Sequence, residues 1–597
     1  MNLSQAYQDL ARACNGRILV MDGNFGTQLS LQMLKEKDYR GQMFVDHSVN
    51  LSGNDAILCI TAPDRVKKVH RAYLEAGADI IRTNTCNATS FGQAPYRLEN
   101  MAYDIAKAGA AVARDALAEY DDDVRNFRTG KLGQVVERKF VAGCIGDLCG
   151  QGSGEDRPGF RELVDAFGEQ VRGLLDGGAD ILLLDGVNDA LNVKAALYAI
   201  DKVCNERGEL VPIMVSGLVS GADGRLSAGQ AAEALRYSVS SFPIFCIGFE
   251  AAGEESDAFP HMKGMGSAPV RMCVMENVDL SKVKPHDSDS VKECAKKIWR
   301  YSDGGLVSVL GGDRNSNPET VRFFVKALKG CRTRRIPARR YDMLLSGLDP
   351  MNISREGPCV MVGREGKVKI FAVNLDKDGD VAEARLSRIP VMVESSKWDM
   401  LVSGLECVQG KGIARSISLA DGEEVFLVKA SEIRKRGFAV VCFAQDEKGP
   451  AETFERETAI IERMYRLLVG KLNFLAEDIV FEPNVRAPDG SELSVDPVNM
   501  LFKVCRYVKA NLPYAHMLGD ASTLGLAYDD EEVQAGVRSV FLHHAKKCGL
   551  DFIVANDEPH PVYEEIPYRL SCLLEDAVLS RTADARQKLN VFIASRL

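Results

Sequence analysis

The sequence predicts an α/β protein made of two tandem (β/α)8 barrels. Short, almost continuous apolar runs alternate with amphipathic stretches along the chain, and these runs fall into two sets of eight. Strands that are apolar on both faces and joined by helices are typical of a parallel sheet covered on both sides. Eight of them in one stretch most simply close into a barrel, and 597 residues suffice for two domains of barrel size.

The first set of runs lies in residues 1–330, which we take as the first barrel. Two of its helix–strand junctions nearly repeat, because in each a glycine ends a helix and an apolar strand begins after Asp79 or Asp180. The eight expected strands are 18–23, 79–85, 140–146, 180–187, 212–219, 244–250, 270–277 and 306–312.

A basic segment with a proline follows, and we assign residues 331–357 to a linker and 358–597 to the second barrel. Only residues 364–367 separate its first two runs. Parallel neighbours need a crossover of about a dozen residues or more, whereas a short glycine-containing connection joins antiparallel strands. We therefore expect this barrel to be incomplete or distorted at its first strands. Its runs are 359–363, 368–374, 390–395, 413–418, 438–444, 478–484, 514–520 and 551–556.

Composition excludes several classes of function. The net charge of -10 argues against nucleic-acid binding, and no apolar run approaches the roughly 18 residues that span a bilayer. The first residues contain neither a basic segment nor an apolar one, as an export signal would. Sixteen cysteines without a framework spacing favour reduced thiols. We therefore expect a cytoplasmic protein with no nucleic-acid or membrane partner.

Polar residues stand at the ends of the first eight strands, where barrel active sites lie. Arg314 can hold a carboxylate through two hydrogen bonds, and Asp22 or Asp185 can hold an ammonium, so an amino-acid-like ligand is expected. The alternative is that Glu250 or Asp313 pairs with Arg314 and fills a site without function. The residues expected to converge are Asp22, Asn84, Asp147, Asp185, Ser216, Glu250, Glu276 and Asp313.

Several motifs occur in the order found in cobalamin-dependent methionine synthases, which this chain resembles over nearly its whole length. The homocysteine-binding barrel of that family is matched at residues 21–27, 83–87, 184–192, 216–217 and 223–230. Its folate domain is matched at residues 345–353, 394–399 and 409–413. The resemblance implies two barrels that act in methyl transfer, although ancestry alone does not establish retained function.

The residues that carry the family's chemistry are altered. The resemblance places three zinc-binding cysteines where this chain has Ala251, Asp313 and Arg314, and a guanidinium repels a dication. No Cys-x-x-Cys pair suggests a moved site, so we expect no bound zinc. The cysteines considered for a moved site are Cys86, Cys144, Cys149 and Cys246, the last of which lies well inside a strand.

The second barrel departs from the family pattern as well. Glu394 and Glu482 stand where aspartates are usual, and Arg415 stands where an asparagine is usual. One added methylene moves a carboxylate away from a pterin ring, and Arg415 adds a fixed charge. The expected pterin-like pocket consists of Asn374, Asp376, Glu394, Arg415, Asp446, Glu482 and Asn484.

The resemblance implies that a methyl group passes from a folate-type donor through a corrinoid to a thiol. No Asp-x-His-x-x-Gly element is present, so the corrinoid would arrive on a separate protein, and no tightly bound cofactor is expected. We predict a methyltransferase with a changed acceptor or donor. The alternatives are an inert homologue that docks a corrinoid protein or a methionine synthase, and a barrel with an unrelated reaction. The loss of ligands in both sites favours the inert homologue over the unrelated reaction.

Overall fold

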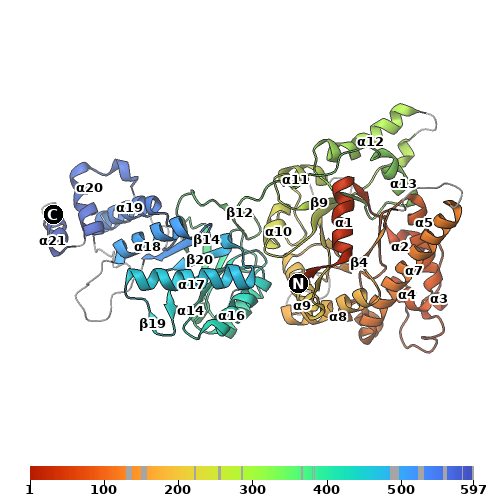
Figure 1. Cartoon of the computed structure of the whole chain (residues 1–597), viewed down its shortest axis with the longest axis horizontal. Coiled ribbons are helices and arrows are strands. Elements are labelled where there is room, and N and C mark those ends of the chain that lie inside the picture. The colour runs from red at the N-terminus through yellow and green to blue at the C-terminus, as the bar shows by residue number, and fades with distance from the viewer. Residues whose placement is uncertain are drawn as a thin grey trace. The chain divides into compact units, whose positions relative to one another are not determined.

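The computed structural model of the protein contains two compact units, Met1–Arg340 and Tyr341–Leu597. Each unit is a barrel of parallel strands surrounded by helices (Figure 1). The predicted fold class is therefore confirmed. The structure describes residues 1–128, 137–148, 158–220, 223–252, 257–283, 287–364, 367–379, 381, 384–484, 497–521, 530–555, 561–580 and 582–594.

All eight strands expected in the first unit form one parallel sheet. Its ends meet where Met21 bridges Ile80 and the Asp22 amide donates to the Ile80 carbonyl at 3.0 Å, so the sheet comes round into a barrel. In spatial order the strands are β2 (Leu19–Val20), β10 (Val309–Gly312), β9 (Arg271–Glu276), β8 (Cys246–Ala252), β7 (Ile213–Ser220), β5 (Ile181–Val187), β4 (Phe140–Gly146) and β3 (Ile80–Arg82).

Helices cover the outside of this barrel, and glycines end them where the sequence predicted. Gly77 follows the helix before β3 with a φ of 104°, and Gly178 precedes β5 with a φ of 94°. Both are left-handed conformations that suit glycine. The longer covering helices are α5 (Pro63–Ala76), α7 (Ala102–Arg128), α8 (Phe160–Asp176), α9 (Ala190–Arg207), α12 (Ser288–Asp303) and α13 (Pro318–Ala327).

A helix closes the amino-terminal end of the first barrel. Leu10 and Cys14 of α1 (Gln5–Gly16) are buried in the same apolar cluster as Leu19, Ile80 and Phe140, which begin or lie near the beginning of their strands. The opposite end, where the strands finish, carries the polar residues. This arrangement leaves one open end for a ligand, as in other barrels of this type.

The segment assigned to a linker is divided between the two units. Arg334 packs on the first barrel, where its guanidinium donates to the carbonyl oxygens of Ala268 and Val270 at 2.7 and 3.0 Å. Residues 341–357 belong to the second unit instead. There β11 (Met343–Ser346) and β12 (Pro350–Ile353) form an antiparallel hairpin whose apolar side chains join the interior of the second barrel.

The second barrel is closed, so the expectation of a barrel opened at its first strands was wrong. Val362 and Gly363 pair in parallel with Ile370 and Phe371. The link is short because the strands overlap by only these two residue pairs, and the chain does not have to return along the whole first strand. In spatial order the strands are β13 (Val360–Gly363), β14 (Ile370–Asn374), β15 (Val391–Glu394), β16 (Ile413–Ile417), β17 (Ala439–Phe443), β20 (Ile479–Glu482), β21 (His516–Asp520) and β22 (Phe552–Val554).

Every cysteine in the described part of the chain is a free thiol. Among the described helices, none combines the length and the apolar character that crossing a membrane requires.

Candidate functional site

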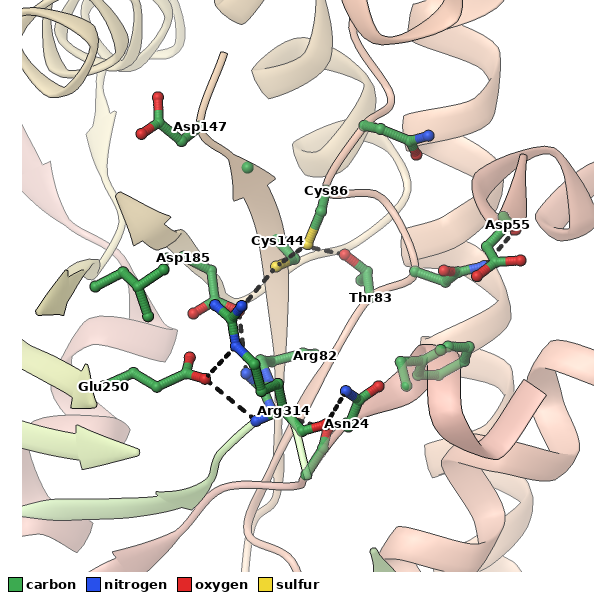
Figure 2. Close-up of a pocket in the computed structure, with 18 of the residues that line it drawn as sticks. Asn24, Asp55, Arg82, Thr83, Cys86, Cys144, Asp147, Asp185, Glu250 and Arg314 are labelled. Atoms are coloured by element: carbon green, nitrogen blue, oxygen red, sulfur yellow. Dashed lines mark hydrogen bonds and ion pairs between the residues drawn. The ribbon is translucent and has the colours of Figure 1, made fainter. Parts of the chain in front are cut away.

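A cavity of about 600 Å³ opens at the carboxyl ends of the first barrel's strands (Figure 2). The predicted convergence of strand ends is found for Asn84, Asp147, Asp185, Glu250 and Arg314, all of which line this cavity. They come from the ends of β3, β4, β5, β8 and β10, which are far apart in the sequence. The closed sheet brings them to one rim because parallel strands all finish at the same end.

A buried arginine that the sequence analysis did not single out organises the floor of the cavity. Arg82, the last residue of β3, donates from Nε to Asp22 Oδ1 at 2.9 Å and from Nη1 to Asp185 Oδ2 at 3.0 Å. Its Nη2 group donates to the carbonyl oxygens of Gly23 and Gly312 at 2.7 and 3.1 Å. One guanidinium therefore ties together the ends of β2, β3, β5 and β10.

Asp22 lies beneath this arginine and does not line the cavity. Its side chain is fully buried, and it also accepts a hydrogen bond from the Arg82 amide at 2.8 Å. Burial raises the pKa of Asp22 to about 6, although the adjacent Arg82 guanidinium opposes this rise. In this structure Asp22 supports Arg82 and does not face the cavity, where it was expected to meet a ligand's ammonium.

Three further strand-end residues do not line the cavity either. Ser216 is fully buried. Asp313 accepts hydrogen bonds from the Asn315 amide at 2.9 Å and from the Ser316 hydroxyl at 2.8 Å, so it shapes the turn after β10. Glu276 accepts hydrogen bonds from Arg300 and from the Tyr301 hydroxyl, so it binds the outer helix α12.

Arg314 and Glu250 form an ion pair across the rim of the cavity (Figure 2). The backbone amide and the Nε group of Arg314 donate to Glu250 Oε1 at 3.2 and 3.0 Å. Burial raises the pKa of Glu250, a rise that nearby Asp185 adds to and Arg314 opposes. The Arg314 side chain is 53% exposed, and its two terminal amino groups have no hydrogen-bond partner among the described residues.

Polar groups also line the side of the cavity near Asp55. Burial raises the pKa of the Asp55 carboxyl group. The Asn84 side chain donates to the Asp55 carbonyl oxygen at 2.6 Å, and the Tyr39 hydroxyl donates to the Asp55 carboxylate at 3.2 Å. Asn24 accepts from the Thr27 amide at the start of a helix. Asp55 thus adds a further carboxylate to the cavity wall, beside Asp147, Asp185 and Glu250.

Two cysteines from neighbouring strands meet in this cavity beside Asp185. Cys86 Sγ lies 2.8 Å from Cys144 Sγ, and Cys144 Sγ lies 3.6 Å from Asp185 Oδ2. The hydrogen bond with Cys86 and burial both raise the pKa of the Cys144 thiol. Within the described ranges, these three residues form the one group whose ligand atoms lie close enough together to hold a metal ion.

The positions where the resemblance expects zinc ligands do not fit a dication. Arg314 lies on the cavity rim paired with Glu250, Asp313 is turned into its own loop, and Ala251 offers no ligand atom. Cys86 and Cys144 supply soft ligand atoms at another place in the same cavity. The loss of the three usual cysteines therefore does not by itself establish the expected loss of zinc. Cys149, also considered above, lies outside the described residues.

Comparison with known proteins agrees with the first barrel. Residues 19–328, just over half of the chain, match the model of the family described as homocysteine S-methyltransferase. The chain belongs to this family. The finer resemblance to cobalamin-dependent methionine synthase stays a prediction.

Solved structures similar to the chain include homocysteine methyltransferase MmuM from Escherichia coli. Its metallated form is 17% identical, with 52% of this chain and 95% of that chain covered and a TM-score of 0.40. Its oxidised form is 16% identical with the same coverage and a TM-score of 0.39. At these values the structures add no argument to the family assignment.

The second barrel of this homocysteine S-methyltransferase family member has an arginine at its strand ends. Arg415 donates from Nε to Glu482 at 2.9 Å, from Nη1 to Glu394 at 3.2 Å and from Nη2 to Asp520 at 2.9 Å. Burial alone disfavours the charged form, but Glu482 and the other two carboxylates raise the pKa of Arg415. The structure thus brings together three of the predicted pterin-pocket residues and adds Asp520.

The other residues predicted for this pocket bond to their own surroundings. Asp376 accepts from the Ser395 hydroxyl and the Ser396 amide, both at 2.7 Å, and Asn374 accepts from the Asp376 amide at 3.1 Å. Two predicted residues remain. Asp446 accepts from Arg456 at 2.6 Å, and the Asn484 amide donates to Glu457 at 2.6 Å. The pterin role of these residues stays a prediction.

A signal for the missed arginine was present in the sequence. Arg82 is a charged residue at the end of the apolar run that begins at Asp79. The ends of parallel strands lie next to one another in the barrel mouth. A charged side chain at such an end therefore needs a partner of opposite charge from a neighbouring strand end. Asp55 gave no such signal, since it begins a short 3-10 helix, Asp55–Ile57, that is far in the sequence from any strand end.

Proposed function

We propose that this protein transfers a methyl group to the sulfur atom of an amino-acid-like thiol bound in the first barrel. The observation that carries the proposal is the family match, which spans the barrel whose strand ends form the cavity. The zwitterionic part of the acceptor follows from the cavity's charges, and the thiol follows from the family.

Arg314 is the residue that recognises the acceptor's carboxylate. Its Nε group is fixed by Glu250 at 3.0 Å, and its terminal amino groups project from an exposed side chain. A guanidinium held in this way can form charge-assisted hydrogen bonds with a carboxylate. The acceptor's ammonium meets the carboxylates on the cavity wall, with Asp55 and Asp185 as the supporting groups.

The donor side is a folate-type compound in the second barrel, with the methyl group carried between the sites by a separate corrinoid protein. Glu394 supports this part, because it is 39% exposed at the end of β15 and can accept hydrogen bonds from an aminopyrimidone ring. Arg415 compensates the charges of the neighbouring carboxylates.

Acceptor binding is tested by calorimetric titration of homocysteine into the wild-type protein and into Arg314→Ala. Arg314→Ala removes charge-assisted hydrogen bonds worth about 1.5–3 kcal/mol, so its affinity for homocysteine should be roughly 10- to 150-fold lower than that of the wild type. Arg172→Ala is the matched control, because Arg172 forms a similar exposed ion pair with Glu206 outside the cavity. Equal affinities of the two variants would contradict the role of Arg314.

Methyl transfer is tested by incubating the protein with thiol amino acids and methylcobalamin, which replaces the corrinoid protein, and measuring S-methyl products by mass spectrometry. Titration with methyltetrahydrofolate tests the second barrel, where Glu394→Gln should weaken binding and exposed Glu424→Gln should not. A protein that binds none of these compounds contradicts the proposal.

A second candidate function is an inert homologue that binds a corrinoid protein or a methionine synthase. The Arg314–Glu250 pair favours it, because the two charges satisfy each other without a ligand. This candidate predicts no binding of amino acids, together with a stable complex between the purified protein and a purified corrinoid carrier. The homocysteine titration therefore separates the two functions.

A further inference from the structure

We propose that Cys86, Cys144 and Asp185 form a zinc site in the first barrel, displaced from the position where the family resemblance expects one. The three ligand atoms lie within 4.8 Å of one another. Two sulfurs and one carboxylate oxygen suit zinc, and three protein ligands leave a fourth position open, as in catalytic zinc sites. Only the role of the metal, which is to activate the acceptor thiol, rests on the proposed function.

The fold brings these ligands together from three adjacent strands. Cys144 and Asp185 lie within β4 and β5, which pair so that Cys144 opposes Leu183 and Gly146 opposes Asp185. Cys86 follows β3, the neighbour of β4 on its other side. Figure 2 shows the two sulfur atoms facing each other between the strands, with the Asp185 carboxylate below them.

Only a small movement is needed to admit the metal. With Zn–S distances of about 2.3 Å and tetrahedral angles, two coordinated sulfurs lie about 3.8 Å apart, and a sulfur and a carboxylate oxygen lie about 3.5 Å apart. The Asp185 carboxylate already lies near this spacing, since its Oδ2 atom, the oxygen that also accepts from Arg82, is 3.6 Å from Cys144 Sγ. The sulfurs, at 2.8 Å, must separate by about 1 Å. Cys86 can supply this movement because it is exposed, whereas Cys144 is buried.

Arg82 orients the carboxylate for this role. It holds Asp185 Oδ2 at 3.0 Å, while the buried Oδ1 atom has no hydrogen-bond partner among the described residues. A buried carboxylate oxygen without a donor is costly unless a cation or ligand compensates it. Such outer contacts are typical of metal ligands, whose partners fix their orientation. The charge of Arg82 is itself compensated by fully buried Asp22.

The charge of the cavity also permits a dication. Uptake of zinc by two thiols releases two protons, so the total charge of the cavity does not change. A zinc ion here would lower the pKa of an acceptor thiol at the open position and keep it as a thiolate. The chain's own part is to hold the acceptor's carboxylate with Arg314, on the same cavity rim, and its ammonium with Asp55, because Asp185 would be bound to the metal.

The test is the zinc content of the full-length protein, purified without chelators and without an affinity tag, measured by mass spectrometry. We expect one zinc per chain. Replacement with Co²⁺ should give a sulfur-to-cobalt charge-transfer absorption. Cys86→Ser and Cys144→Ser should each lower zinc affinity by more than about 100-fold, beyond the effect of outer-contact changes. Cys294→Ser, a partly exposed cysteine of α12 outside the cavity, should change neither property.

Three results would overturn the site. They are no zinc uptake by the reduced protein, equal zinc affinity in the Cys86, Cys144 and control variants, and a Cys86–Cys144 disulfide that forms under reducing conditions in place of metal binding. Circular dichroism establishes that each variant is folded. The zinc measurement needs no methyl donor, so its result is independent of the methyl-transfer assay. Zinc binding together with a negative methyl-transfer assay would contradict only the proposed function, and methyl transfer by zinc-free protein would contradict only the metal site.

Discussion

Removal of the Arg82 guanidinium should destabilise the first barrel by an amount that depends on pH. In Arg82→Met, Asp22 stays fully buried but loses its cation, and the Gly23 and Gly312 carbonyl oxygens lose a donor. Breaking a buried ion pair by removing one partner typically costs about 3–5 kcal/mol. Asp22 is the dominant contribution because, of the two carboxylates that pair with Arg82, it is the fully buried one, whereas Asp185 is partly exposed to the cavity.

Protonation of Asp22 limits this cost. A carboxyl group with an ordinary pKa near 3.9 costs about 4 kcal/mol to protonate at pH 7 and about 1.5 kcal/mol at pH 5. Burial already raises the pKa of Asp22 in the wild-type protein to about 6. Since a raised carboxyl pKa favours the folded state at low pH, the deficit of Arg82→Met should shrink as the pH falls from 7 to 5.

The assay uses the position of the two tryptophans. Trp299 lies in the first unit and Trp398 in the second, so a Trp398→Phe background leaves fluorescence that reports on the first barrel alone. With a urea m value of about 3 kcal/mol per M, a loss of 4 kcal/mol lowers the midpoint at pH 7 by about 1.3 M. Asp22→Asn added to Arg82→Met should restore most of this loss, because it removes the uncompensated charge.

The reasoning would be refuted by any of three outcomes. One is a loss below about 1 kcal/mol at pH 7, which would mean that Asp22 and Arg82 are solvated. Another is an equal deficit at pH 5 and pH 7, which would mean that Asp22 does not titrate. The third is strict additivity of the two substitutions, because residues in contact should show an interaction energy.

Two more predictions concern the second barrel, followed through Trp398 in a Trp299→Phe background. Arg415→Asn should destabilise it by about 3–5 kcal/mol at pH 7, because Glu482 and its neighbours lose their shared cation; an unchanged urea midpoint would contradict the ion cluster. Glu457 is buried, which raises its pKa to about 8, so its contribution to stability is complete below pH 4.5 and is lost as the pH rises through 8. Glu457→Gln should therefore match the wild type near pH 4.5 and exceed its stability at pH 9, and a deficit at pH 9 would contradict this assignment.

Much of the fold could be predicted because each strand has a local signature. All sixteen expected strands exist, since a parallel strand buried on both faces is a continuous apolar run and its partners do not alter that pattern. The short connection between β13 and β14 was wrongly expected to join antiparallel strands. A short connection can also join parallel strands, provided that the chain runs back along only a small part of the first strand. That distance depends on the register of Val362 and Ile370, which the sequence does not give.

The candidate site could be predicted less completely. The side chains at strand ends were expected to converge. Which of the carboxylates reach the cavity depends on their contacts with Arg82, which bonds both Asp22 and Asp185. It draws Asp22 into the core and leaves Asp185 at the surface of the cavity. Cys86 and Cys144 were judged by spacing in the sequence. They are 58 residues apart, yet they meet because β3 and β4 are neighbours in the barrel.

The elements that close the amino-terminal ends of the barrels determine where the chain can be divided. Helix α1 precedes the first barrel and the β11–β12 hairpin precedes the second, so each barrel carries its own closure immediately before its first strand. A cut between Arg340 and Tyr341 therefore yields two halves that each retain a complete apolar interior. A cut at residue 357 would remove Met343, Leu345 and Ile353 from the second interior and expose it to water. We therefore expect that the two barrels can be produced apart and recombined, which would show whether the proposed methyl transfer needs them on one polypeptide.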